Sequence, residues 1–252
     1  MKKRRSSFIY KIDTDEPENK LLDKIKQFVN TQRINFNSNR PWHGFLAQEN
    51  VVIFQKVGKY YLTKFGFEIK AEVILFNQEI HVNYLQEEVP VIFDVYNKYV
   101  VINSSSSSHR TVVQTAMMNH LQDKQYIRLN RITYKPEFLK WLVNNAIDNS
   151  DIIIKINWAK ITELIDYDEN TTDVAVGSDD QVRDSDVYKQ VENEGKHISL
   201  KSFVRINEAT ILTRIYATGQ ITMVAEFPEY GTYLTQLVNE LERLRNLSGT
   251  GD

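Results

Sequence analysis

The sequence predicts an α+β protein in which mostly antiparallel sheets carry helices on one face. Apolar residues alternate with polar ones along several short segments, helical spacing appears between these segments, and turn-forming residues separate them. The composition fits a folded protein, since 42% of the 252 residues are hydrophobic and 25% are charged. No cysteine is present, which excludes disulfides, thiolate metal sites and a cysteine nucleophile.

The first half begins with a helix and continues as a meander of strands. Asp15 is a suitable N-cap, and Leu21, Ile25 and Phe28 follow with helical spacing. Strands are then predicted over residues 51–54, 60–62, 67–73, 80–85 and 91–102, with tight turns at 57–59 and 97–98. Residues 111–122 return to helical spacing, which predicts a second helix.

The second half also mixes helices and strands. Strands are predicted over residues 126–133, 151–156, 174–176, 199–206 and 211–225. Pro136 marks the start of one helix, and Ser185 caps a short helix that Gly195 ends. A longer helix is expected over residues 233–244, because its apolar residues recur with helical spacing.

Two segments resemble each other at a fixed offset of 120 residues. Residues 91–123 and 211–243 overlay without gaps, and each is expected to form a strand, a tight turn, a strand, a loop and a helix. The overlay favours two similar halves that each contain a ββα unit, although amphipathic helices also match one another by chance. We place the halves at residues 1–123 and 124–252, with an acidic insert at about 163–194 in the second half.

The charge is unevenly spread along the chain. Residues 1–140 carry a net charge of +7 and residues 141–252 a net charge of −9, which gives −2 for the whole chain. Eleven acidic residues lie between Glu163 and Glu194. This asymmetry favours a charged partner for the basic half, whereas a solvated insert is the simpler interpretation of the acidic residues.

Few motifs indicate catalysis or cofactor binding. The glycines form no dinucleotide-binding or Walker pattern, Gly-x-Ser-x-Gly is absent, and the histidines lack metal-ligand spacing. Glu68-Ile69-Lys70 resembles a nuclease triplet in which the carboxylate binds Mg²⁺. The alternation around it instead predicts that Glu68 and Lys70 are exposed on one sheet face, without a further acid for a metal. The serine run 104–108 is either a phosphate-binding loop or a connector.

These observations together favour a non-catalytic protein that binds a polyanion, above all nucleic acid, through its basic N-terminal half. The residues expected to contact the nucleic acid, or another acidic partner, are Lys2, Lys3, Arg4, Arg5, Arg40, Trp42 and Arg110. No catalytic residue, metal or cofactor is expected. Two alternatives remain open: a protein-interaction subunit of a cytoplasmic assembly, for example in antiviral defence, and a metal-dependent nuclease that uses Glu68 and Lys70.

The N-terminus resembles the start of a signal peptide only in its basic residues. Lys11 and Asp13 interrupt the apolar stretch that follows, so the hydrophobic core of a signal peptide is missing. No run of 18 uncharged apolar residues occurs that would form a membrane-spanning helix. We therefore expect a cytoplasmic protein without membrane contact.

Overall fold

The computed structural model describes residues 3–31, 42–48, 51–52, 54–74, 80–104, 111–115, 128–145, 152–164, 172–226 and 229–250. The chain divides into two compact units. The N unit comprises residues 10–130, and the C unit comprises residues 1–9 together with residues 131–252. The strand β1 (Lys3–Asp13) starts in the C unit and ends in the N unit.

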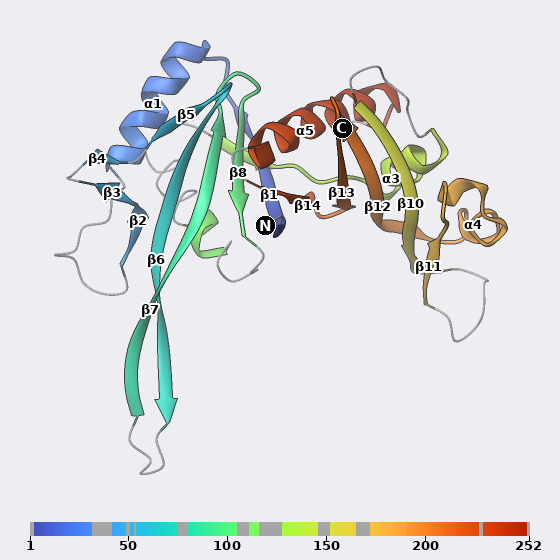
Figure 1. Ribbon diagram of the computed structural model, residues 1–252, viewed down its shortest axis with the longest axis horizontal. Coiled ribbons are helices and arrows are strands. Elements are labelled where there is room, and N and C mark those ends of the chain that lie inside the picture. Colours follow the sequence, from blue (N-terminus) through green and yellow to red (C-terminus); the bar gives the residue numbers. More distant parts are fainter. Residues whose placement is uncertain are drawn as a thin grey trace. The chain divides into compact units, whose positions relative to one another are not determined.

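The N unit contains a helix, a four-stranded antiparallel meander and a second helical segment. The helix α1 (Glu18–Thr31) precedes the strands β2 (His43–Phe45), β6 (Tyr60–Ile74), β7 (Ile80–Asp94) and β8 (Tyr99–Asn103), which are hydrogen-bonded in that order (Figure 1). Three short strands lie between β2 and β6 in the sequence: β3 (Ala47–Gln48), β4 (Val51–Val52) and β5 (Gln55–Val57). Residues 111–115 are helical, as predicted, and the rest of that predicted helix lies outside the described residues.

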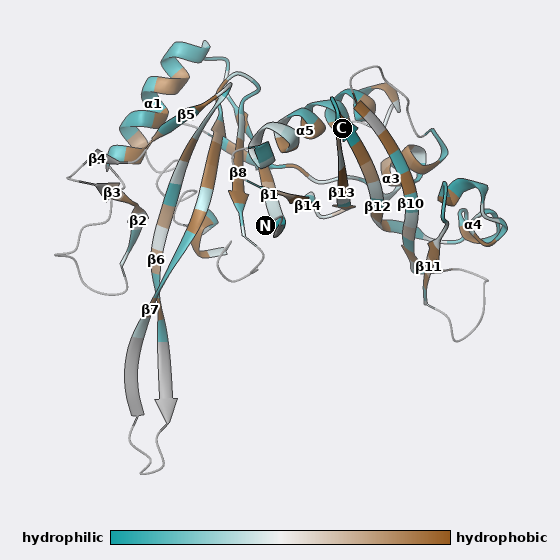
Figure 2. Cartoon of the chain, viewed as in Figure 1, coloured by the Kyte–Doolittle hydropathy of each residue, from teal (hydrophilic) through white to brown (hydrophobic). Residues whose placement is uncertain are grey.

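Aromatic side chains pack α1 against the meander. Leu21, Ile25 and Phe28 are all buried, as their helical spacing predicts. The Phe28 ring meets the Phe45 ring edge-on at a centroid distance of 5.5 Å, and Phe45 meets Phe65 of β6 at 5.2 Å. Figure 2 shows both hydrophobic and hydrophilic bands on α1, as expected of a helix with one buried face.

The strands β6 and β7 form a long two-stranded ribbon. Their pairing runs continuously from Tyr61–Phe93 to Ile74–Ile80, whereas β7 pairs with β8 only over residues 91–94. The outer part of the ribbon therefore projects beyond the other strands of the N unit (Figure 1). The sequence predicts a break between residues 85 and 91, but β7 is one continuous strand. Pro90 is tolerated within it because β8 pairs with β7 only from residue 91 onward.

The C unit has helices on one face of an antiparallel sheet. After β9 (Arg128–Arg131), the order is α3 (Pro136–Asn144), β10 (Ile152–Thr162), β11 (Asp173–Gly177), η1 (Val182–Asp184), α4 (Asp186–Val191), β12 (Lys196–Ile206), β13 (Ala209–Tyr216), β14 (Gln220–Ala225) and α5 (Glu229–Leu247). Hydrogen bonds connect the strands in the order β11–β10–β12–β13–β14–β1. Within the part of the chain described, no helix is long and apolar enough to cross a membrane.

Both units follow one order of elements. Each has a helix, four antiparallel strands and a second helix, with short elements inserted between the first and the second strand. The acid-rich residues 163–194 lie in this insertion in the C unit, between β10 and β12. The predicted α+β class is therefore confirmed, and so is the strand–turn–strand–helix order that the two similar segments share.

The gap-free offset of 120 residues is wrong in its register. Asp94 pairs with Tyr99 beside the turn between β7 and β8. At that offset the equivalent pair is Arg214 with Gly219, but Arg214 pairs with Thr222. The physical reason is the position of the turn, since residues 217–219 separate β13 from β14, whereas the offset of 120 carries the turn at residues 95–98 onto residues 215–218.

The two structural units differ far less in net charge than the two halves of the sequence, because their boundaries are different. The basic N-terminal residues belong to the C unit, which has 17 basic and 20 acidic residues, whereas the N unit has 14 basic and 13 acidic residues. The net charges of the units are therefore −3 and +1. A charged binding surface must accordingly be sought on individual faces and not in a whole unit.

Candidate nucleic-acid interface

Alternating burial divides the C-unit sheet into two faces. On β13, Ile211, Thr213 and Ile215 are buried, whereas the residues between them are partly exposed. The buried face meets α5, because the Tyr230 hydroxyl of that helix lies 2.7 Å from Ser7 Oγ on β1. Successive side chains of a strand point to opposite faces, so the neighbours of these residues form a second, more exposed face.

We call this second face the open face, and it is rich in cations. It consists of Arg4, Ser6 and Phe8 on β1; Gln220, Thr222 and Val224 on β14; Thr210, Leu212, Arg214 and Tyr216 on β13; and Ser199, Lys201, Phe203 and Arg205 on β12. Four of these residues are cations and none is acidic. A surface of one sign attracts ligands of the opposite charge.

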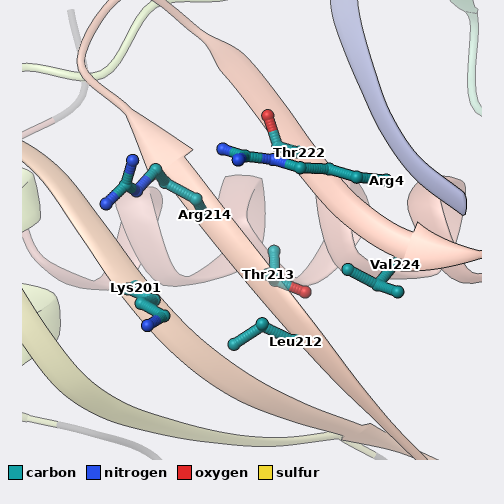
Figure 3. A pocket seen from close by; sticks show the side chains of 7 residues that line it. All are labelled: Arg4, Lys201, Leu212, Thr213, Arg214, Thr222 and Val224. Atoms are coloured by element: carbon teal, nitrogen blue, oxygen red, sulfur yellow. The ribbon is translucent and has the colours of Figure 1, made fainter.

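The strand register brings the cations together. Lys201 pairs with Arg214, and Arg214 pairs with Thr222, so their side chains share a face on three adjacent strands. An open hollow of about 240 Å³ is lined by Arg4, Lys201, Leu212, Thr213, Arg214, Thr222 and Val224 (Figure 3). Figure 3 shows the Arg4 side chain extending across β14 toward Arg214. Cations that are about two hundred residues apart in the sequence thus converge on one depression.

An aromatic pair lies beside this hollow. The Arg214 guanidinium lies over the Trp158 ring of β10, 4.6 Å from its centroid, and 5.8 Å from the centroid of the Tyr216 ring. Trp158 is the register partner of Lys201, so it belongs to the same face. A guanidinium over an aromatic ring stabilises the pair by about 0.5–2 kcal/mol, depending on its exposure. The contact holds both the cation and the ring in defined positions.

Two further aromatic residues extend the open face. Phe203 is 41% exposed and pairs with Lys155 of β10 on one side and with Leu212 on the other. On β1, the Phe8 ring is covered by the guanidinium of Arg131, whose carbon lies 4.4 Å from the ring centroid. Cations and rings therefore lie together on β10, β12 and β13, whereas β14 has neither on this face and the Phe8 ring of β1 is buried.

The cations of the open face differ from those at its edge in their partners. Within the described ranges, no ion pair involves Arg4, Lys201, Arg205 or Arg214. At the edge, the β10 lysines Lys155 and Lys160 pair with Asp180 and Asp173 of the acidic insertion, the second pair at 2.9 Å. The centre of the open face is therefore free to attract an anion, while its β10 edge is partly neutralised.

The structure separates the basic residues that the sequence groups at the N-terminus. Arg4 lies on the open face, and Lys3 is in the same strand. Arg5 is directed to the opposite face, because it pairs with Met223, whose side chain is buried. Lys2, Arg40 and Arg110 lie outside the described residues, so their predicted contacts stay predictions.

Trp42 and Glu68 lie together in the N unit, where the prediction for Glu68 is wrong. Glu68 is 8% exposed and not on a solvated face, because the backbone before β2 covers it. The Trp42 amide donates to Glu68 Oε2 at 3.3 Å, and the Glu68 amide donates to the Trp42 carbonyl at 2.8 Å. Trp42 and Glu68 line a small pocket together with Glu87 and Glu88. Three carboxylates therefore lie near Trp42, and their negative charge disfavours a phosphate there.

A metal-dependent nuclease gains no support from this part of the N unit. No cluster of three His, Asp or Glu side chains suited to a metal ion occurs among the residues that the structure describes. Lys70 is exposed, as the alternation predicts, while Glu68 is buried two residues earlier. The two therefore do not form the exposed pair that the alternation predicts.

Sequence reasoning missed most of the open face. The signal that could have found it is the pattern Lys201-Ser202-Phe203-Val204-Arg205, in which a cation, an aromatic and a cation alternate with residues that are buried. In a strand this pattern places both cations and the ring on one face. Counting charge over halves of the chain conceals it, since the surrounding acidic residues fold elsewhere.

No protein-family model matches the chain, and no curated protein sequence matches it either. The function of the open face must therefore be inferred from its own residues.

Proposed function

We propose that this protein is a nucleic-acid-binding protein and that the open face of the C unit holds the phosphate backbone. The observation that carries the proposal is the group of four cations, Arg4, Lys201, Arg205 and Arg214, on four adjacent strands whose residues on the open face include no acidic side chain. A chain of net charge −2 does not attract a polyanion through its overall field. A local surface of one sign does, because each phosphate contact releases a condensed counterion.

The residue types on this face support binding over catalysis. Arginine contacts phosphate through several N–H donors, and lysine adds a point charge. Side chains on strands are held more firmly than side chains on loops, so the cations keep their spacing. Base-specific readout is not expected from phosphate contacts, which position a ligand but carry no sequence information.

Salt dependence provides the test. Four phosphate contacts predict a log–log slope of affinity against salt of about −3, so binding should weaken by roughly 50-fold between about 50 and 200 mM salt. Fluorescence anisotropy of a labelled 20-nucleotide probe measures this directly. The double variant Lys201→Glu/Arg214→Glu should reduce affinity at the lower salt by more than about tenfold and flatten the slope.

A charge-matched variant distinguishes the open face from the basic residues singled out in the sequence. Arg40→Glu/Arg110→Glu changes the net charge by the same amount. If the open face alone holds the phosphates, this variant should bind within about threefold of wild type, whereas a larger loss would support the contacts predicted from the sequence. Circular dichroism establishes that both variants are folded. Loss of binding only in the Arg40/Arg110 variant would move the interface to the N unit.

The alternative is a protein-interaction subunit of a cytoplasmic assembly, including one that acts in antiviral defence. The exposed Phe203 ring suits a protein contact as well as a nucleic acid. Absence of salt-dependent binding to any oligonucleotide at about 50 mM salt would reject the nucleic-acid proposal and favour this alternative.

A further inference from the structure

We infer that the ligand of the open face is single-stranded nucleic acid, whose bases stack on Phe203 and on the Trp158–Arg214 pair. The inference rests on the proposed function and names the form of nucleic acid that the same face takes. Cations alone would bind any polyanion. The aromatic side chains favour a polyanion that also has exposed bases, since bases stack on flat rings and phosphates do not.

The exposure and neighbours of Phe203 support base stacking. The ring is 41% exposed on a strand whose inward residues are fully buried, so it does not stabilise the core. Its register partners are Lys155 and Leu212, which place a cation on one side and an apolar side chain on the other. A base lying on this ring would keep its phosphates within reach of lysines and arginines on the adjacent strands.

The contact between Arg214 and Trp158 provides a second stacking position. The guanidinium carbon lies 4.6 Å from the centroid of the indole ring, and both residues belong to the row that contains Lys201. A guanidinium that is held over a ring has its outer face open to a base. Unpaired bases stack on guanidinium planes as they stack on aromatic rings. Two stacking positions on neighbouring strands suit successive bases of one strand.

A duplex cannot use these groups in the same way. Its base faces are stacked inside the helix, and sequence readout from a groove normally relies on an inserted helix or ribbon. The open face is built from strands of a sheet, with its rings interleaved among cations. This is the combination of stacking platform and positive groove that binds single strands with little sequence preference.

The experiment compares three probes of 20 units: oligo-dT, oligo-rU and a DNA duplex, each titrated by anisotropy at about 50 mM salt. Wild type should bind both single strands at least about tenfold more tightly than the duplex, and the comparison of dT with rU separates DNA from RNA. Phe203→Ala should weaken single-strand binding by about tenfold without changing the salt slope, because it removes stacking and no charge. Phe203→Tyr should retain the affinity.

A matched control is Val187→Ala, which removes an apolar side chain that is 48% exposed on α4, away from the open face. It should bind like wild type. The inference would be overturned if the duplex bound as tightly as the single strands or more tightly, or if Phe203→Ala bound both single strands with wild-type affinity. In either case a loss of affinity in Lys201→Glu/Arg214→Glu would still support the proposed function. Absence of binding to all three probes would overturn both.

Discussion

His197 and Tyr188 form a buried hydrogen-bonded pair in the C unit. The Tyr188 hydroxyl lies 3.0 Å from His197 Nε2, and both side chains are almost inaccessible to solvent. Burial lowers the pKa of His197 to about 4, with a smaller contribution from the Lys140 charge. Burial also raises the pKa of Tyr188 well above its ordinary value. Both groups are therefore neutral at neutral pH.

The lowered pKa of His197 predicts a loss of stability in acid. In the unfolded chain a histidine takes up a proton near pH 6.5, whereas the folded state resists protonation down to about pH 4. The contribution to the unfolding free energy is fully present above the unfolded pKa and should fall by about 2–3 kcal/mol between pH 7 and about 4.5.

Urea unfolding at several pH values measures this contribution. The variant Tyr188→Phe/His197→Phe removes both polar groups and should show a pH dependence that is weaker by the same amount. An unchanged pH dependence in the double variant would show that His197 titrates normally in the folded protein.

Gly219 is required by a contact as well as by its backbone conformation. It lies in the turn between β13 and β14 with φ +77°, and a Cβ there would come within 1.6 Å of the Ile132 carbonyl oxygen. Gly219→Ala should therefore lower the unfolding free energy by at least about 3 kcal/mol.

Gly58 is the matched control for this prediction. It also has positive φ, at +58°, but an added Cβ meets no described atom within 4 Å. Gly58→Ala should cost only about 1 kcal/mol, the strain of the left-handed region. Equal losses for the two variants in thermal unfolding would show that the close approach at Gly219 is unimportant.

At the scale of elements, sequence periodicity predicts helices and strands better than it predicts their pairing. Leu21, Ile25 and Phe28 identify α1 because helical spacing is a local property. The register of β13 with β14 depends on where the turn falls, and the turn at residues 217–219 instead of 215–218 shifts every partner. That is why the predicted order of elements is correct while the offset of 120 residues is not.

The candidate site could be predicted only in small part, because β1 lies in one sheet with strands that are distant from it in the sequence. The charge of Arg4 is evident in the sequence, but the cations beside it on the open face come from β12 and β13, about two hundred residues later. Because the side chains of a strand alternate, Arg5 points to the other face, although it is adjacent in sequence to Arg4. Long-range strand pairing, which local patterns do not specify, decides which cations meet.

The insertion between β10 and β12 should weaken binding at one edge of the open face. Asp180 and Asp173 neutralise Lys155 and Lys160, so Asp173→Asn/Asp180→Asn should free two cations. We expect affinity for a single-stranded probe to rise several-fold at about 50 mM salt, with a slope that is steeper by about 1.4.

Asp184→Asn/Asp186→Asn provides the control, since it removes the same charge from the same insertion. Asp184 lies 4.0 Å from Arg183 and Asp186 lies 3.7 Å from Lys189, so this variant leaves the ion pairs of Lys155 and Lys160 intact. It should change the affinity less and leave the slope unchanged. An equal gain in both variants would mean that net charge matters and the two lysines do not.

At the scale of the whole molecule, two units with the same order of elements have different exposed surfaces. The strand β8 of the N unit has the place that β14 has in the C unit, but all five residues of β8 are buried, whereas Gln220 and Val224 of β14 are partly exposed. The C unit has the higher content of acidic residues, but its open face has none. Arrangement on a face, and not net charge, thus favours the C unit as the binding part.

Photo-crosslinking tests this central claim most directly. A 20-nucleotide single strand carrying 5-iodouracil is irradiated with the wild-type protein, and mass spectrometry maps the adducts to peptides. We predict adducts in the peptides that contain Trp158, Phe203 and Tyr216, because these rings lie on the open face among its cations. Adducts confined to residues 32–50 or 104–127 of the N unit would contradict the account.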